Sequence, residues 1–132
     1  MPEVGREAAE EEFERLAAAA DVDIDVSKMD QDDTEDVVEI RNLLSSAIER
    51  GALSVNDKGQ GVLSVADGDP ITFRVPKGGD LMILASGTES KRMDQMLRFV
   101  CAITGQSTRR IDELNKKEWK LALKLAGFLS AD

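Results

Sequence analysis

Side chains that transfer protons near neutral pH are scarce in this sequence. The chain has no histidine and no tyrosine, and its single cysteine is Cys101. Histidine is the usual general base and the usual activator of a cysteine nucleophile, so Cys101 lacks the neighbour that such chemistry needs. It stands at helical spacing from Leu97 and directly after Val100, which predicts a buried, inert thiol. We therefore expect a protein that is not an enzyme.

The acidic residues near the N-terminus match a calcium-binding loop only in part. Asp21, Asp23 and Asp25 stand at its first three ligand positions, and Asp32 stands at its twelfth. The sixth position holds Val26, where the sharp turn requires glycine, and no glutamate closes the loop. A Gly-Lys-Ser/Thr phosphate-binding loop is absent from the sequence as well. The sequence therefore predicts no metal site and no cofactor.

Two features of the sequence bear on nucleic acids. Residues 99–115 place Gly105 between two helical patterns, as in a helix-turn-helix, and residues 91–124 hold nine bases against four acids. Such a pattern is commoner as a plain helical corner, and a net charge of −9 disfavours DNA binding. A contrary alternative is that the acidic N-terminal segment mimics DNA. Both stay open as functions of a small phage or bacterial regulator, although we do not expect nucleic acid as the main partner.

Charge is distributed unevenly along the 132 residues. Residues 1–39 hold fifteen acids and three bases, whereas residues 40–132 hold eleven acids and fourteen bases. We interpret residues 1–33 as an acidic helix and linker, and residues 34–132 as a single domain. The single cysteine, the lack of a secretory signal and the shortness of the apolar runs indicate a cytoplasmic protein without a membrane span.

The N-terminal segment combines a helical pattern with an acidic stretch. Between Arg6 and Ala20 the apolar residues recur at helical spacing, with at most one large side chain per turn. This pattern predicts a frayed helix that docks weakly on the body or stays mobile. Residues 21–33 are typical of an extended acidic linker, with an edge strand from Val22 to Val26 as the alternative.

The rest of the chain predicts an α+β fold, with a small antiparallel β-meander packed on a mainly helical C-terminal half. Asp33 or Thr34 is expected to cap a helix that Gly51 ends. Turn-forming Asn, Asp and Gly residues then separate three short β-compatible runs. These runs are residues 53–55, 62–65 and 71–75.

Helices alone are predicted after the meander. Pro76 ends the third strand, and Asp80 is expected to cap the next helix. Ser107 or Thr108 should begin a later helix, and Asn115 forms a capping-box pattern with Glu118 for the last one. Between them, a helix that ends at Thr104-Gly105 is expected to have five residues on one inward face: Met93, Met96, Leu97, Val100 and Cys101.

From Leu63 onward the sequence resembles the phage tail assembly chaperones, small proteins of long-tailed phages and prophages that accompany the tape measure protein. That family has a β-hairpin, a segment Arg-x-Pro-x-Gly-x-Asp-Leu, a helix, a Thr-Gly step and a closing helix with Phe-Leu. The corresponding segments here, in the same order, are Arg74 to Leu81, Ile103-Thr104-Gly105, Ile111 to Leu114 and Gly127-Phe128-Leu129. The likeness covers about half of the chain. Residues 1–33 fall outside it, and Lys116, Lys117 and Trp119 depart from the acidic or small residues common there.

The resemblance implies a chaperone that keeps the long, helical, aggregation-prone tape measure protein, its client, soluble until the tail tube assembles. It implies action in the host cytoplasm and absence from the mature virion. Soft or large apolar side chains suit contacts with varied amphipathic helices. The expected partner-binding residues are Met82, Ile83, Met93, Met96, Phe99 and Phe128. For each of them the alternative is a place in the aliphatic core, and self-association is left open.

Overall fold

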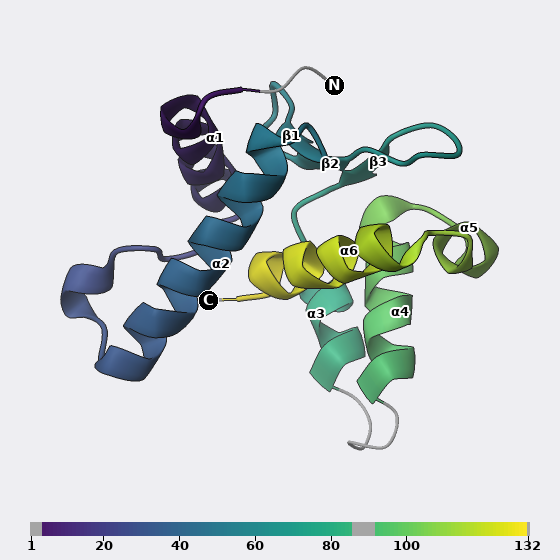
Figure 1. Cartoon of the computed structure of the whole chain (residues 1–132). Helices are drawn as coiled ribbons and strands as arrows, with labels where there is room; N and C mark the ends of the chain where they lie inside the picture. Colours follow the sequence, from purple (N-terminus) through teal and green to yellow (C-terminus); the bar gives the residue numbers. More distant parts are fainter. Residues whose placement is uncertain (1–3, 86–91, 132) are drawn as a thin grey trace.

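The structure, a computed structural model, describes residues 4–85 and 92–131. These residues form an α+β fold with a three-stranded antiparallel sheet, which confirms the predicted fold class (Figure 1). The elements in chain order are α1 (Arg6–Ala19), the 3-10 helix η1 (Val26–Lys28), α2 (Gln31–Glu49), β1 (Leu53–Val55), β2 (Gly61–Leu63), β3 (Ile71–Phe73), α3 (Gly78–Ala85), α4 (Arg92–Thr104), α5 (Thr108–Asp112) and α6 (Lys116–Leu129).

The sheet is the predicted meander, with strand order β1-β2-β3. Its strands β2 and β3 are shorter at their C-terminal ends than the sequence predicts. In the register, Leu63 pairs with Leu53 on one side and with Ile71 on the other, and all three side chains are buried. Period-two alternation thus gives the sheet one apolar face. Helices α1 and α2 contact β1, α6 contacts β2, and α4 contacts β3.

Helix α1 lies in the core. Phe13 and Leu16 are fully buried, and the Phe13 ring centroid is 5.1 Å from that of Phe128 in α6. The guanidinium carbon of Arg41 in α2 lies 5.4 Å from the centroid of the same ring. The prediction of a frayed, weakly docked helix is therefore wrong. One large side chain per turn is enough here because distant parts of the chain enclose each of them.

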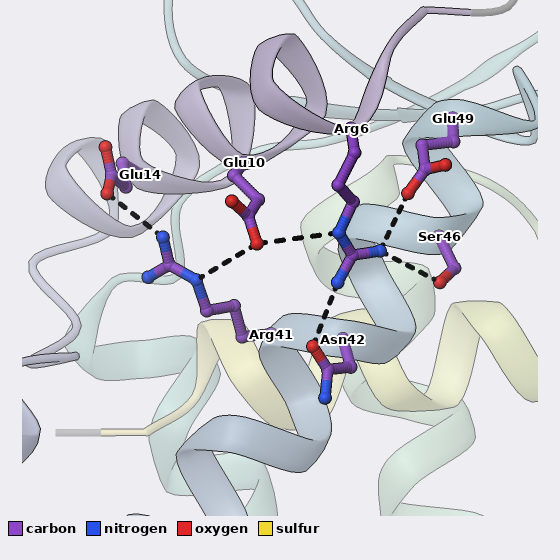
Figure 2. A network of polar contacts seen from close by, with 7 residues as sticks. All are labelled: Arg6, Glu10, Glu14, Arg41, Asn42, Ser46 and Glu49. Carbon is purple, nitrogen blue, oxygen red and sulfur yellow. Dashed lines mark hydrogen bonds and ion pairs between the residues drawn. The ribbon is translucent and has the colours of Figure 1, made fainter.

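A polar network holds α1 against α2 along their exposed side (Figure 2). Arg6 donates hydrogen bonds to Glu49 at 2.7 Å, to Asn42 at 2.9 Å and to Ser46 at 3.2 Å. Arg41 pairs with Glu14 at 3.1 Å. Arg6 and Arg41 therefore each face acids of the opposite helix, and part of the acidic N-terminal charge is used within the fold. Exposed pairs of this kind are worth little one by one, but they fix the register of the two helices.

The connection between α1 and α2 is more ordered than a linker. The Asp25 carboxylate accepts hydrogen bonds from the Ser27 N–H and hydroxyl and caps η1, and these bonds hold the pKa of Asp25 below its ordinary value. Asp30 caps α2 by accepting from the Asp33 N–H at 2.8 Å. Helix α2 thus begins at Gln31, so the predicted caps, Asp33 and Thr34, are wrong. No strand forms at residues 22–26, so the alternative of an edge strand there is wrong.

Most of the predicted helix ends are confirmed. Gly51 and Gly105 follow α2 and α4 with φ of 77° and 68°, conformations that glycine adopts without strain. Ser107 caps α5, and Asn115 forms a full capping box on α6 with Glu118. The predicted inward face of α4 is only partly right. Its buried residues are Gln95, Phe99, Val100 and Ile103, whereas Met93 is 60% exposed.

Candidate functional site

An ion pair between Arg74 and Asp80 positions helix α3. The two guanidinium NH2 groups of Arg74 donate to the two carboxylate oxygens of Asp80, at 2.7 and 2.9 Å. The same carboxylate accepts from the backbone N–H of Lys77 at 2.8 Å. Asp80 therefore lies in the first turn of α3, and its side chain contacts Lys77, the residue that precedes the helix. The prediction that Asp80 is the N-cap itself is wrong. Planar two-bond pairing of this type fixes orientation as well as distance.

Arg74 also ties this joint to the end of α4. Its guanidinium donates to the Ala102 carbonyl at 3.0 Å, and its backbone N–H donates to the Ile103 carbonyl at 3.0 Å. The hydrogen bonds from Arg74 hold the pKa of the Asp80 carboxyl below its ordinary value, against the opposing effect of burial. Hence α3 begins from a charged anchor in the body of the domain and runs along α4 (Figure 1).

Helix α3 is apolar but fully buries none of its apolar side chains, since Ile83 and Leu84 are only half-buried against the core. Its sequence is Gly-Gly-Asp-Leu-Met-Ile-Leu-Ala, and Asp80 is its only residue in the buried class. Leu81 is 40% exposed and Met82 is 70% exposed. An apolar helix in a small domain normally buries its large side chains. We name the exposed apolar residues of the two adjoining helices, Leu81 and Met82 of α3 with Met93 of α4, the α3–α4 surface.

Met93 also borders a groove beside α4, α5 and α6. The groove has a volume of about 450 Å³. Apolar side chains of three elements line it, including Leu97 of α4, Ile111 of α5 and Trp119 of α6. Leu97 and Trp119 are half-buried, so each still presents apolar surface to a visiting side chain. The sequence did not single out Trp119 as a contact residue, because its helical spacing alone predicts only an inward position.

The structure divides the six predicted partner-binding residues into three groups. Met82 and Met93 are exposed, as a contact surface requires, whereas Ile83 and Met96 are half-buried. Phe99 is fully buried, and Phe128 is 6% exposed and packs against Phe13. Those two phenylalanines are therefore core residues, since large aromatic rings at inward helical positions are needed to fill the centre of a domain poor in aromatics.

A second concave region follows the junction of α2 and α6. Its largest part has a volume of about 930 Å³ and lies between the α1–α2 connection, the N-terminal half of α2 and the C-terminal end of α6. Another part, of about 660 Å³, lies between the C-terminal half of α2 and α6. We name this region the α2–α6 groove. Sequence reasoning missed it, because a groove between two helices depends on their crossing and not on either pattern alone.

Side chains suited to catalysis or metal binding are dispersed. Cys101 is half-buried on α4. Within residues 4–85 and 92–131, no three Cys, Asp or Glu side chains converge as metal ligands would. The part of the chain that the structure describes also contains no helix with the length and hydropathy needed to cross a bilayer.

The segment predicted to resemble a helix-turn-helix contains a short second helix. Helix α5 has five residues, about one and a half turns, whereas a recognition helix lies along the major groove over several turns. Arg110 donates to the carbonyls of Asp67 and Asp69 in the β2–β3 connection, at 3.1 and 2.6 Å. Arg109 extends into solvent, with 91% of its side chain exposed, and pairs with Glu113.

No protein-family model matches the chain, and neither a search of curated proteins nor one of solved structures returns a match.

Proposed function

We propose that this chain is a phage tail assembly chaperone that binds a tape measure protein through the α3–α4 surface and keeps that client soluble until the tail tube assembles. The observation that carries the proposal is the exposure of Leu81 and Met82 on α3, an apolar helix that fully buries none of its large apolar side chains. The resemblance of residues 63–130 to the family supports it, since Arg74 and Asp80 of the shared motif form the joint that positions α3.

The chemistry of the α3–α4 surface suits a helical client of variable sequence. Met82 and Met93 have flexible, polarisable side chains that adapt to differently shaped apolar partners. The groove next to Met93 offers Trp119, a residue type common among side chains that dominate binding energy. An amphipathic helix laid across this surface would place its apolar residues at helical spacing against Met82, Met93 and the groove. The proposed mechanism is binding and release in the host cytoplasm, without catalysis.

Co-purification with the tape measure protein of the same phage or prophage tests the proposal. Both proteins are co-expressed, and the affinity of the purified pair is then measured by titration. Each exchange of methionine for serine reduces the apolar area that binding buries, which weakens the binding free energy by about 1 kcal/mol. The double variant Met82→Ser/Met93→Ser should therefore bind about 30-fold more weakly.

A matched control separates surface chemistry from general loss of apolar area. Val4 and Val26 are 38% and 40% exposed and lie on other parts of the molecule. The control variant Val4→Ser/Val26→Ser should bind the client like the unmodified chain. Equal weakening by both pairs, or none by either, would remove the α3–α4 surface from the proposal. Failure of the unmodified chain to bind any tape measure protein would remove the function itself.

The competing proposal is a small regulator that binds DNA or mimics it. The exposed guanidinium of Arg109, in a segment rich in lysine and arginine, favours DNA binding. Binding of this kind is governed by phosphate contacts and weakens steeply as salt is added. Titration with random duplex at two salt concentrations therefore distinguishes DNA binding from the chaperone function, which expects no binding at either.

A further inference from the structure

The three parts of the α2–α6 groove adjoin one another along α2. Ile40 borders both its largest part and a small middle part, and Leu43 borders the middle part and the remaining one. Lys124 borders all three. The centre of the groove is therefore lined by Ile40, Leu43 and Leu123, each of which is half-buried.

The two ends of the groove carry opposite charges. Asp23, Asp33 and Asp36 line the end near the beginning of α2, here called the acidic end. Arg50, Lys117 and Lys120 line the end near the beginning of α6, here called the basic end. Within the described chain, none of these six side chains has an ion-pair partner within 4 Å. Apart from Lys124, each end thus presents unpaired charge of one sign, and the centre between them is apolar except for Glu39 and Lys124.

We propose that the α2–α6 groove is a two-fold interface between two copies of this chain. On α2, Asp36 and Arg50 both stand seven residues from Leu43, about 10 Å away along the helix axis in each direction. Two α2 helices that pack antiparallel about a two-fold axis at Leu43 therefore place Asp36 of each copy opposite Arg50 of the other. The acidic end of one copy then meets the basic end of its neighbour twice, as a self-complementary interface requires.

A second copy explains the charge pattern better than a client helix. A client of varied sequence gives no reason for one acidic and one basic end, whereas a two-fold copy supplies the reversed polarity by symmetry. The half-buried residues Ile40, Leu43 and Leu123 would form the apolar centre of the interface, inside a charged rim. No lining residue of the groove belongs to α3 or α4. A dimer therefore keeps two α3–α4 surfaces free, and a long client could engage both at once.

Charge-reversal variants and their mixture test the interface. The acidic-end variant is Asp33→Lys/Asp36→Lys, and the basic-end variant is Arg50→Glu/Lys120→Glu. Sedimentation or light scattering over a wide concentration range should show a dimer for the unmodified chain. For each variant alone the dissociation constant should rise at least about 100-fold, since like charges then meet at both contacts. An equimolar mixture should restore the dimer, because the reversed ends complement each other.

A control variant carries the same change in charge outside the groove. Lys58 and Arg109 are exposed and do not line it, so Lys58→Glu/Arg109→Glu should dimerise normally. A monomeric unmodified chain at every concentration, or a mixture that stays monomeric, overturns the proposal.

A cysteine at the axis gives an independent readout. Leu43→Cys, combined with Cys101→Ser, should form a disulfide-linked dimer on mild oxidation. Absence of that cross-link overturns the proposal even where a charge variant fails to fold.

Discussion

Replacing Phe13 with alanine is expected to destabilise the whole domain and not only helix α1. Phe13 is fully buried between Phe128 of α6 and Arg41 of α2. Deleting a buried phenyl ring typically costs about 4 kcal/mol, including the cavity that remains. About 1 kcal/mol of this belongs to the ring–ring and cation–ring contacts. The free energy of unfolding of a domain of this size is about 5–15 kcal/mol. Phe13→Ala should therefore remove a large share of the stability.

Trp119 provides a reporter far from the substitution. It is the only tryptophan, the chain has no tyrosine, and it lies on α6. With a denaturant dependence of about 2 kcal/mol per molar urea, the midpoint followed by Trp119 fluorescence should fall by about 2 M. The exposed control Val26→Ala should change the stability by less than about 0.5 kcal/mol. If Phe13→Ala alters the far-UV circular dichroism but leaves the Trp119 midpoint in place, α1 is not part of the cooperative core.

The other predictions concern the anchor of α3, a tight turn and the N-terminal segment. Asp80→Asn should cost about 2 kcal/mol in urea unfolding at neutral pH, because the charged hydrogen bonds from Arg74 are weakened. Since the folded-state pKa of Asp80 is lowered, this contribution is complete above the unfolded pKa of about 3.9 and is lost as the pH falls further, so wild type and variant should converge only in acid. Gly59→Ala should lower the melting temperature more than Gly105→Ala. Both glycines have positive φ, but only at Gly59 would the new Cβ meet another atom, the Ala19 Cβ at 2.5 Å; an equal effect would contradict the packing. Deleting residues 1–33 should abolish the cooperative unfolding transition, and a truncated chain that still unfolds cooperatively would show that α1 is dispensable.

Local sequence signals predicted the elements that depend on near neighbours. The capping box of Asn115 and Glu118 and the stop at Gly105 are confirmed because each requires only a few adjacent residues. The cap of α2 was placed three or four residues late, since Asp30, Asp32 and Asp33 at its start are chemically equivalent as caps. Only the backbone path decides that Asp30 accepts the hydrogen bond.

Long-range packing explains the larger differences between the predicted and the observed structure. The stripe of α1 looked too thin to dock, but Phe13 and Leu16 meet partners on distant elements. The wide apolar face of α6, with both Leu125 and Phe128, was the one local sign that this helix has more than one neighbour. The pairing of Arg74 with Asp80 was missed as well, because the alternation of residues 71–75 indicated only a solvent-facing arginine.

The candidate site was predicted only in part, again because long-range packing decides which residues are exposed. Periodicity puts methionine and phenylalanine on the same faces and cannot separate exposed from buried members. Met82 and Met93 became surface residues because α3 contacts α4 at the edge of the domain. Phe99 and Phe128 became core residues because β3 and α1 approach α4 and α6 from the other side.

Amide hydrogen exchange of the full chain, with and without a helical segment of the tape measure protein, tests most directly whether the protein acts through the α3–α4 surface. Binding should slow exchange in α3 and in the first turns of α4, around Met82 and Met93, and leave the exchange of α1 unchanged. Protection confined to other elements, or none at saturating client, would contradict the proposed function.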